Sequence, residues 1–115
     1  MDLTKKKGLL APKDFWTTSE TEKKKILNEC GGDVVTAALV PNNILGKDVS
    51  VACDIHDFMY LKGKTSQDKV VADNTFAKNL KALTDQTQNP ILRKLRGLIG
   101  RIYYLAASIF GHFYF

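Results

Sequence analysis

The stretch "SVACDIHDFMY" (residues 50–60) places two titratable side chains, His56 and Asp57, among small and apolar residues. The apolar residues recur at helical spacing, and Gly63 follows as a stop signal, so a helix is predicted here. A polar group on the apolar side of a helix costs about 1–3 kcal/mol unless it finds a partner. The side that is expected to be buried carries Val49, Ala52, Cys53, His56, Met59 and Tyr60.

A second helix is predicted to follow a short turn. Thr65 and Asp68 have the spacing of a capping box, in which each side chain binds a backbone N–H near the start of the helix. The residues that follow keep helical spacing. The stripe that is expected to be buried carries Val70, Asp73, Ala77 and Leu80.

His56 and Asp73 are expected to face each other. In an antiparallel helix pair, residues at equal distances from the connecting turn lie side by side, and Lys64 is near the midpoint between these two. A hydrogen bond between them would satisfy both buried groups and leave the second imidazole nitrogen free, which is the arrangement of an oriented general base. Asp57, one residue further round the helix, is expected to form a neighbouring anionic site.

A third helix is predicted after Asn89-Pro90, which breaks the chain. Its apolar end is shorter than the roughly 20 residues of a membrane-spanning helix. We therefore interpret it as a core helix with an interfacial tip. The apolar residues that mark it, over about twenty positions, are Ile91, Leu95, Leu98, Ile102, Leu105, Ile109 and Phe113.

The composition is that of one folded domain with a basic surface. A chain of 115 residues closes one modest core, and 44% hydrophobic with 25% charged residues is typical of globular proteins. Lys and Arg total 17 against 12 acids, so the net charge of +5 draws the protein towards nucleic acid or an anionic membrane. The apolar run after the first lysines is too short for a signal peptide, so none is predicted in this chain.

The structure of the segments before the first of these helices is predicted from their composition. Residues 1–29 form a polar, Lys-rich region with a helix predicted over about residues 18–28. Residues 30–47 carry Gly, Pro and Asn signals and are predicted to be a long loop, a feature that is usually functional in a small domain. Cys30 and Cys53 are the only cysteines, and the sequence allows either a disulfide between them or two reduced thiols.

Several motifs together resemble the phospholipase A2 superfamily. "ACDIHDFMY" resembles its catalytic helix, in which Cys, two residues, His-Asp, two residues and Tyr follow one another. "CGG" (residues 30–32) is similar to the Cys-Gly of the family's calcium loop, and "VPNNILGKDVSVAC" to the segment before the catalytic helix in bacterial, fungal and plant-like members. "ADNTFAKNL" resembles the segment that supplies the carboxylate that orients the histidine, and "RIYYLAASIFG" the closing helix of bacterial-type members.

The resemblance covers roughly residues 28–111 and departs from the animal secreted enzymes. The loop lacks their aromatic residue and clustered glycines, and Met59 stands where they have another cysteine. The disulfide scaffold of those enzymes is therefore nearly absent. These departures favour a bacterial, fungal, plant-like or viral type over the animal secreted class. The resemblance as a whole implies secretion or delivery to a target membrane over a resident cytoplasmic location.

The resemblance also implies roles for individual residues. His56 would activate a water molecule, Asp73 would hold His56, and Tyr60 would brace Asp73. The cofactor would be Ca²⁺, a cation that takes several oxygen ligands from carboxylates and backbone carbonyls. Its ligands would be the Asp57 carboxylate and the carbonyls of Glu29, Gly31 and Asp33.

The predicted fold is therefore all-α, as a single phospholipase A2-like domain over residues 1–115. It would combine an antiparallel pair of catalytic helices, a metal-binding loop before the first helix, and a long C-terminal packing helix. Residues 1–29 would form the N-terminal region, residues 30–47 the calcium loop, and residues 48–115 the helical core.

Three functions compete on this basis. The leading hypothesis is calcium-dependent hydrolysis of the sn-2 ester of glycerophospholipids at a membrane surface that the enzyme binds peripherally. The alternative is a catalytically silent phospholipase A2-like protein that binds membranes. A metal phosphohydrolase or a nucleic-acid binder is weakly supported, because the chain has two histidines and no base-reading motif. An inhibitor or partner protein is not identifiable from the sequence.

Overall fold

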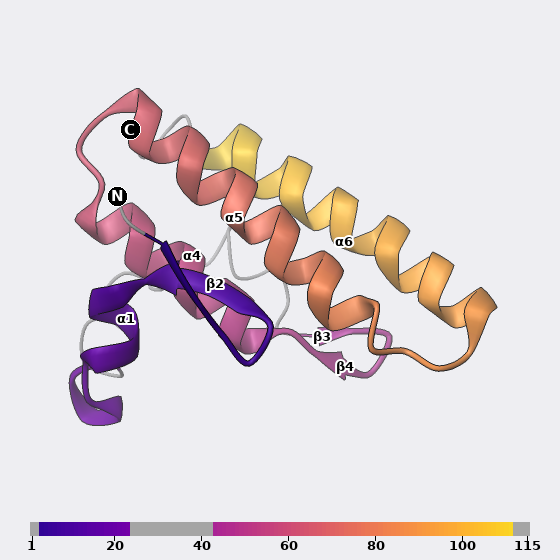
Figure 1. The fold of residues 1–115 in the computed structure, drawn as a ribbon. Helices are drawn as coiled ribbons and strands as arrows, with labels where there is room; N and C mark the ends of the chain where they lie inside the picture. Colours follow the sequence, from indigo (N-terminus) through magenta and orange to yellow (C-terminus); the bar gives the residue numbers. More distant parts are fainter. Residues whose placement is uncertain (1–2, 24–42, 112–115) are drawn as a thin grey trace.

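A computed structural model describes residues 3–23 and 43–111 of the chain. Three long helices form the body of the described part: α4 (Ser50–Lys62), α5 (Ser66–Thr84) and α6 (Pro90–Gly111). The first two run antiparallel, and α6 lies along α5 in the opposite direction to it (Figure 1). The prediction of a mostly helical domain is confirmed.

The ends of these helices follow from local sequence. The Asp48 carboxylate accepts a hydrogen bond from the Ser50 N–H at the start of α4, at 2.8 Å. Gly63 ends α4, and its N–H donates to the Met59 carbonyl. The capping box of Thr65 and Asp68 is present at the start of α5, as predicted.

The N-terminal region contains a β-hairpin, so the all-α prediction is wrong there. Strands β1 (Leu3–Lys6) and β2 (Leu9–Pro12) pair antiparallel, and a short helix α1 (Lys13–Thr17) follows. The turn uses Lys7 and Gly8, both with positive φ (55° and 83°), as tight hairpin turns require. A turn that begins with lysine lacks the Asn-Gly signature of tight hairpins, so no hairpin was predicted here. Of the helix predicted over residues 18–28, residues 20–23 are helical and the rest lies outside the described residues.

A second hairpin shows that the prediction of one loop over residues 30–47 is wrong for the last part of that range. Strands β3 (Asn43–Ile44) and β4 (Lys47–Asp48) pair through a turn of Leu45 and Gly46, both with positive φ. The hairpin is tied to α6, because Tyr103 donates its hydroxyl proton to the Asn43 carbonyl and Arg96 donates to the Leu45 carbonyl. The earlier part of the predicted loop lies outside the described residues.

The N-terminal hairpin is fastened to α5 by one buried amide. The Asn79 side chain accepts a hydrogen bond from the Leu10 N–H and donates one to the Leu10 carbonyl, each at 2.8 Å. In addition, Phe15 of α1 packs edge-on against Phe58 of α4, with ring centroids 5.4 Å apart. The hairpin and α1 therefore cover α4 and α5 on the side that Figure 1 shows in front.

Two predicted apolar stripes are not buried as expected. On α5, Asp73 and Leu80 of the predicted stripe are buried, whereas Ala77 is half-buried and Val70 is exposed. Lys69 and Phe76, which the prediction did not include, are buried as well. On α6, the side that packs on the core carries Ile99, Gly100, Tyr103 and Ala107, where small residues allow a close approach to α5. The residues that were predicted to be the buried stripe of this helix are exposed: Ile91, Leu95, Leu98, Ile102, Leu105 and Ile109. Phe113 lies outside the described residues.

Replacing Asn79 should detach the N-terminal hairpin. Asn79→Leu keeps the branched shape of the side chain but leaves the N–H and carbonyl of Leu10 without their partner, so we expect a loss of about 2–4 kcal/mol in the free energy of unfolding. Urea denaturation would measure it. Asn74→Leu on the exposed side of the same helix is the matched control. Equal stability of the two variants would contradict this role of Asn79.

Candidate functional site

His56 lies on the buried side of α4 and faces α5, as the sequence predicts. Its Nε2 atom lies 2.8 Å from Oδ1 of Asp73, and 7% of the His56 surface is exposed. The rings of Tyr60 and Phe76 pack beside the imidazole, with centroids 4.1 Å and 4.6 Å away. The structure therefore brings together three predicted residues: His56, Asp73 and Tyr60.

The Asp73 carboxylate gathers three donors. Its Oδ1 atom receives hydrogen bonds from His56 and from the Tyr60 hydroxyl, and its Oδ2 atom receives one from the Lys69 ammonium at 2.6 Å. Burial by itself raises the pKa of this carboxyl, but the hydrogen bonds from His56, Lys69 and Tyr60 outweigh it and hold the pKa at about 2. Asp73 is therefore an anion at any physiological pH.

The charge of Asp73 fixes which imidazole nitrogen carries hydrogen. An ionised carboxylate only accepts hydrogen bonds, so Nε2 of His56 must be the donor in this contact. In the neutral imidazole, Nδ1 then carries a lone pair. No hydrogen bond to Nδ1 occurs among the described residues. This nitrogen can accept a proton from a molecule that approaches the site.

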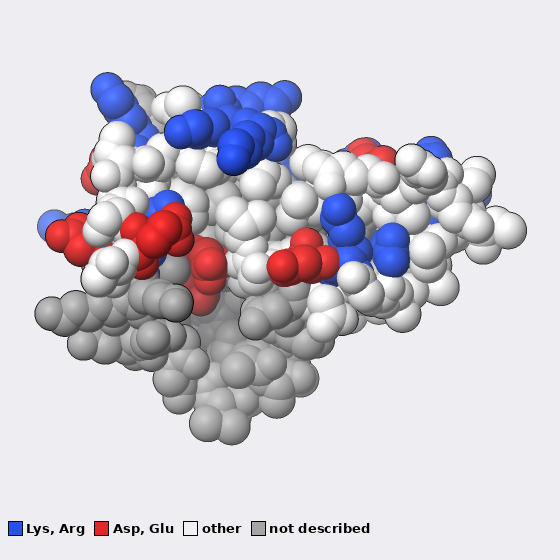
Figure 2. Space-filling view, turned by 90° about the horizontal axis from the view of Figure 1, so that it is seen from below, with Lys and Arg blue, Asp and Glu red and all other residues white. Residues whose placement is uncertain are grey.

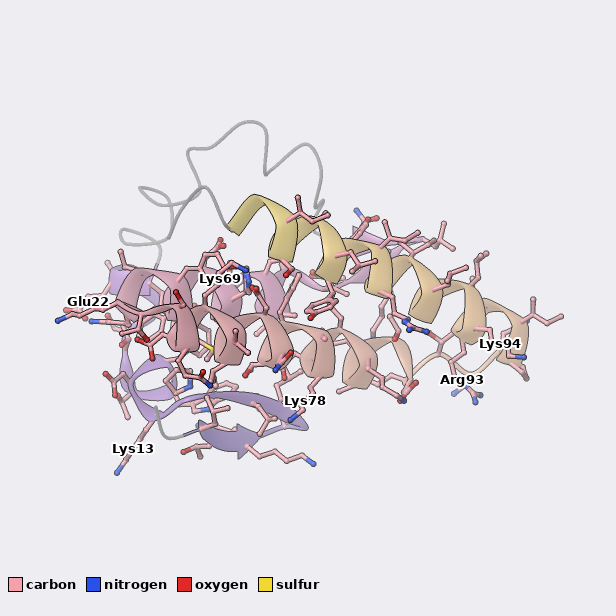
Figure 3. All side chains as sticks on the ribbon, turned by 90° about the horizontal axis from the view of Figure 1, so that it is seen from above. Lys13, Glu22, Lys69, Lys78, Arg93 and Lys94 are labelled. Atoms are coloured by element: carbon pink, nitrogen blue, oxygen red, sulfur yellow. The ribbon has the colours of Figure 1, made fainter. Side chains whose placement is uncertain are left out.

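Lys69 is a member of the site that the sequence analysis missed. It is buried, and besides Asp73 its ammonium donates to the Ser108 carbonyl of α6 at 3.0 Å. Figure 3 shows Lys69 reaching from α5 towards α6. Lys69 precedes Asp73 by one helical turn, and this i,i+4 spacing was the available signal. It was overlooked because lysine is almost never buried unless it is paired.

Asp57 has a different environment from Asp73. It is half-buried, and among the described residues it has no hydrogen-bond or ion-pair partner. Burial raises the pKa of the Asp57 carboxyl to about 6; the nearby His56 lowers it, and the charge of Asp54 raises it further. An unpaired carboxylate of this kind gains stability from a bound cation.

The other predicted calcium ligands cannot be placed against Asp57. Glu29, Gly31 and Asp33 lie outside the described residues. Within the described part of the chain, no three His, Cys, Asp or Glu side chains are grouped so that they could hold a metal ion. The carboxylate of Asp57 thus fits a calcium ion as one ligand, and a complete site would need further oxygen atoms.

Cys53 carries a free thiol on α4. Burial, followed by the charges of Asp57 and Asp54, raises the pKa of this thiol to about 12, so it stays protonated and unreactive. Cys30, its partner in the disulfide that the sequence allowed, lies outside the described residues.

Comparisons of this chain with family models, with curated proteins and with solved structures gave no match. The candidate site therefore rests on the contacts of its own residues.

The raised pKa of Asp57 predicts a pH dependence of stability in the presence of chelator. The carboxyl ionises near pH 4 in the unfolded chain but near pH 6 in the folded one, so the folded state loses stability as the pH rises from about 4 to 6. Asp57→Asn should remove this loss, on the order of 2 kcal/mol. Thermal unfolding of both proteins across this range would measure it, and a difference that does not change with pH would contradict it. Asp73 does not contribute in this range, because its lowered pKa gives stability that is lost only below about pH 4.

Removing the Lys69 charge should be costly for the fold. Lys69→Met leaves the buried Asp73 anion without its ion pair, and such losses cost about 3–5 kcal/mol. Adding Asp73→Asn should recover part of this loss, because it removes the uncompensated charge. Urea denaturation of both single variants and the double variant would measure the coupling, and strictly additive losses would contradict it. The exposed pair of Lys81 and Asp85, also at i,i+4, is the matched control and should contribute less than about 1 kcal/mol.

Proposed function

We propose that this protein is a calcium-dependent phospholipase A2 that hydrolyses the sn-2 ester of glycerophospholipids. The observation that carries the proposal is the 2.8 Å contact between Nε2 of His56 and the ionised Asp73, which leaves Nδ1 as a proton acceptor. The products would be a lysophospholipid and a fatty acid.

In this mechanism His56 is the general base. Asp73 holds the imidazole in the tautomer that has its hydrogen on Nε2, so the Nδ1 lone pair is ready to remove a proton from water as the water attacks the ester carbonyl. The imidazolium that forms is stabilised by the Asp73 carboxylate at 2.8 Å. The same nitrogen can then return the proton to the leaving alkoxide, which balances the proton over the reaction.

Tyr60 and Lys69 are positioning residues in this proposal. Both donate to the Asp73 carboxylate, which restricts its rotation and keeps one oxygen on His56. The rings of Tyr60 and Phe76 restrict the imidazole itself. This support keeps the base oriented while its charge changes.

Asp57 would supply the carboxylate ligand for calcium, and the carbonyls of Glu29, Gly31 and Asp33 remain the expected partners. Calcium, when bound, supplies positive charge that stabilises the oxyanion formed at the ester carbonyl. The support for this assignment is that Asp57 follows His56 in the chain and that its half-buried carboxylate has no cationic partner among the described residues.

The alternative is a catalytically silent membrane-binding protein with the same fold. One observation favours it: Lys69 neutralises Asp73, so the three donors around this carboxylate would also suit a purely structural ion pair. Such a protein would bind phospholipid vesicles in the presence of calcium and release no product.

Substitution of the base should separate these functions. On phosphatidylcholine vesicles with Ca²⁺, His56→Gln should lower the rate of fatty-acid release by about 10²–10⁴-fold, because proton transfer loses its acceptor. Asp73→Asn should lower it less, since the base remains and only its tautomer control is lost. Chelator should abolish release by the wild type. His112→Gln is the matched control, because it changes the only other histidine. Release by His56→Gln at the wild-type rate would contradict the mechanism, and no release by the wild type would favour the silent alternative.

A further inference from the structure

The exposed side of α6 is an unbroken aliphatic surface. Its residues are 47% to 81% exposed and follow one another at spacings of four and three positions, so they form a single stripe along the helix. Single exposed apolar residues are ordinary on a protein surface, but a contiguous row of them marks a site of association. This apolar stripe consists of Ile91, Leu95, Leu98, Ile102, Leu105 and Ile109.

The charges of α6 are all of one sign. The helix sequence contains Arg and Lys but no Asp or Glu. Lys94 and Arg101 are exposed and directly precede Leu95 and Ile102, so they lie along one flank of the apolar stripe. Long basic side chains beside an apolar stripe can bury their stems while their charges reach the phosphate groups of lipids.

The basic residues are also unevenly distributed over the rest of the molecule. Figure 2, which views the molecule from below, shows Lys and Arg gathered most densely along one edge and again towards one end, and Asp and Glu mainly in the middle of that face. Figure 3 shows Lys13 and Lys78 on the side of the molecule opposite to α6, whereas Lys94 lies at the start of α6. Because surface potentials act over about 8 Å at physiological ionic strength, Lys94 and Arg101 affect binding at the apolar stripe more than the net charge of the whole protein does.

Partners other than an anionic lipid surface fit the charges beside the apolar stripe less well. Two copies of α6 paired along it would bring together basic helices with no acidic residue on either to compensate. Spanning a bilayer is also unsupported, since the described helices include none with the length and apolar character of a membrane span. An anionic lipid surface, in contrast, offers both an apolar layer and negative charge.

The apolar stripe ends next to the candidate site. Ser108 directly precedes Ile109, and its carbonyl accepts a hydrogen bond from Lys69, the same ammonium that binds Asp73. The Lys69 side chain therefore links the α6 backbone beside the end of the stripe to the carboxylate that holds His56. A surface docked along α6 would lie close to that end of the site.

We propose that the apolar stripe of α6, with Lys94 and Arg101 on its flank, docks the protein in the plane of an anionic phospholipid surface. The significance of this docking for catalysis rests on the proposed function, but the docking itself does not require hydrolysis. The helix lies at the level of the phosphate groups with its aliphatic side chains among the upper acyl carbons. Attraction between the basic flank and the anionic headgroups strengthens this docking.

Vesicle binding of the His56→Gln protein tests the docking without turnover. Two vesicle types are compared by co-sedimentation: phosphatidylcholine alone, and an equimolar mixture with phosphatidylglycerol. We expect tighter binding to the mixture, and a loss of about tenfold or more for Leu98→Gln/Ile102→Gln, because two aliphatic side chains no longer enter the lipid. Leu61→Gln/Val70→Gln removes two exposed apolar residues from other helices and should change binding less than about twofold.

A second pair of variants tests the basic flank. Lys94→Gln/Arg101→Gln should lower the preference for the anionic mixture and reduce its salt dependence. Lys13→Gln/Lys78→Gln lowers the net charge equally but lies on the opposite side, so it should have a smaller effect. Equal effects of the two pairs would overturn the role of the flank.

The outcomes separate docking from catalysis and from self-association. Unchanged vesicle binding by the stripe variant would overturn the docking, whatever the wild type hydrolyses. Conversely, loss of binding in this variant supports docking even if the wild type releases no fatty acid. Sedimentation without vesicles tests a second copy as the occupant: a dimer that Leu98→Gln/Ile102→Gln dissociates would overturn the proposal. Circular dichroism checks that each variant is folded, and the single variants Leu98→Gln and Ile102→Gln repeat the comparison with a smaller change.

Discussion

The buried carboxylate of Asp73 is the point on which the helix packing depends. A buried anion is tolerated only when it is paired and hydrogen-bonded, and here the donors come from α4 and from α5 itself. Lys69 extends this hydrogen-bond network to α6, because the same ammonium also donates to the Ser108 carbonyl. One charge thereby fixes how the three helices lie against one another, since a shift of any of them would leave a buried polar group without its partner.

Two carboxylates of the site show how burial and partners act in opposite directions. Both Asp57 and Asp73 are removed from water, which raises their pKa values. For Asp73, three hydrogen-bond donors reverse this effect and hold the pKa at about 2, so its negative charge is compensated by groups of the protein itself. For Asp57, burial prevails and the pKa rises to about 6, because no cationic partner among the described residues compensates its charge. Such divergence between neighbouring titratable groups is typical of sites that assign different tasks to the same residue type.

The two sides of α6 illustrate a limit of apolar periodicity. The helix is apolar on more than one side, and a repeat of 3.6 residues identifies a stripe without saying what covers it. Gly100 lies 3.7 Å, measured from the position of an added Cβ, from Ile44 and Leu80, so the side with small residues fits closely against the core. The bulkier Ile and Leu residues on the other side are left exposed, where their role depends on a partner.

The sequence by itself determined the three long helices, the caps at their ends, and the facing pair of His56 and Asp73, because these depend on spacing along the chain. Thr65 with Asp68, Gly63 and Asn89-Pro90 act within one turn of the backbone, and the equal distances of His56 and Asp73 from the connecting turn bring them together. Only the tertiary structure decided the hairpins at Lys7-Gly8 and Leu45-Gly46, whose turns lack the usual residues. It also decided the pairing of Lys69 with Asp73 and the exposed side of α6. These features depend on which surfaces meet in space, and burial of a charge or exposure of an aliphatic stripe is set by a neighbouring element that local sequence does not specify.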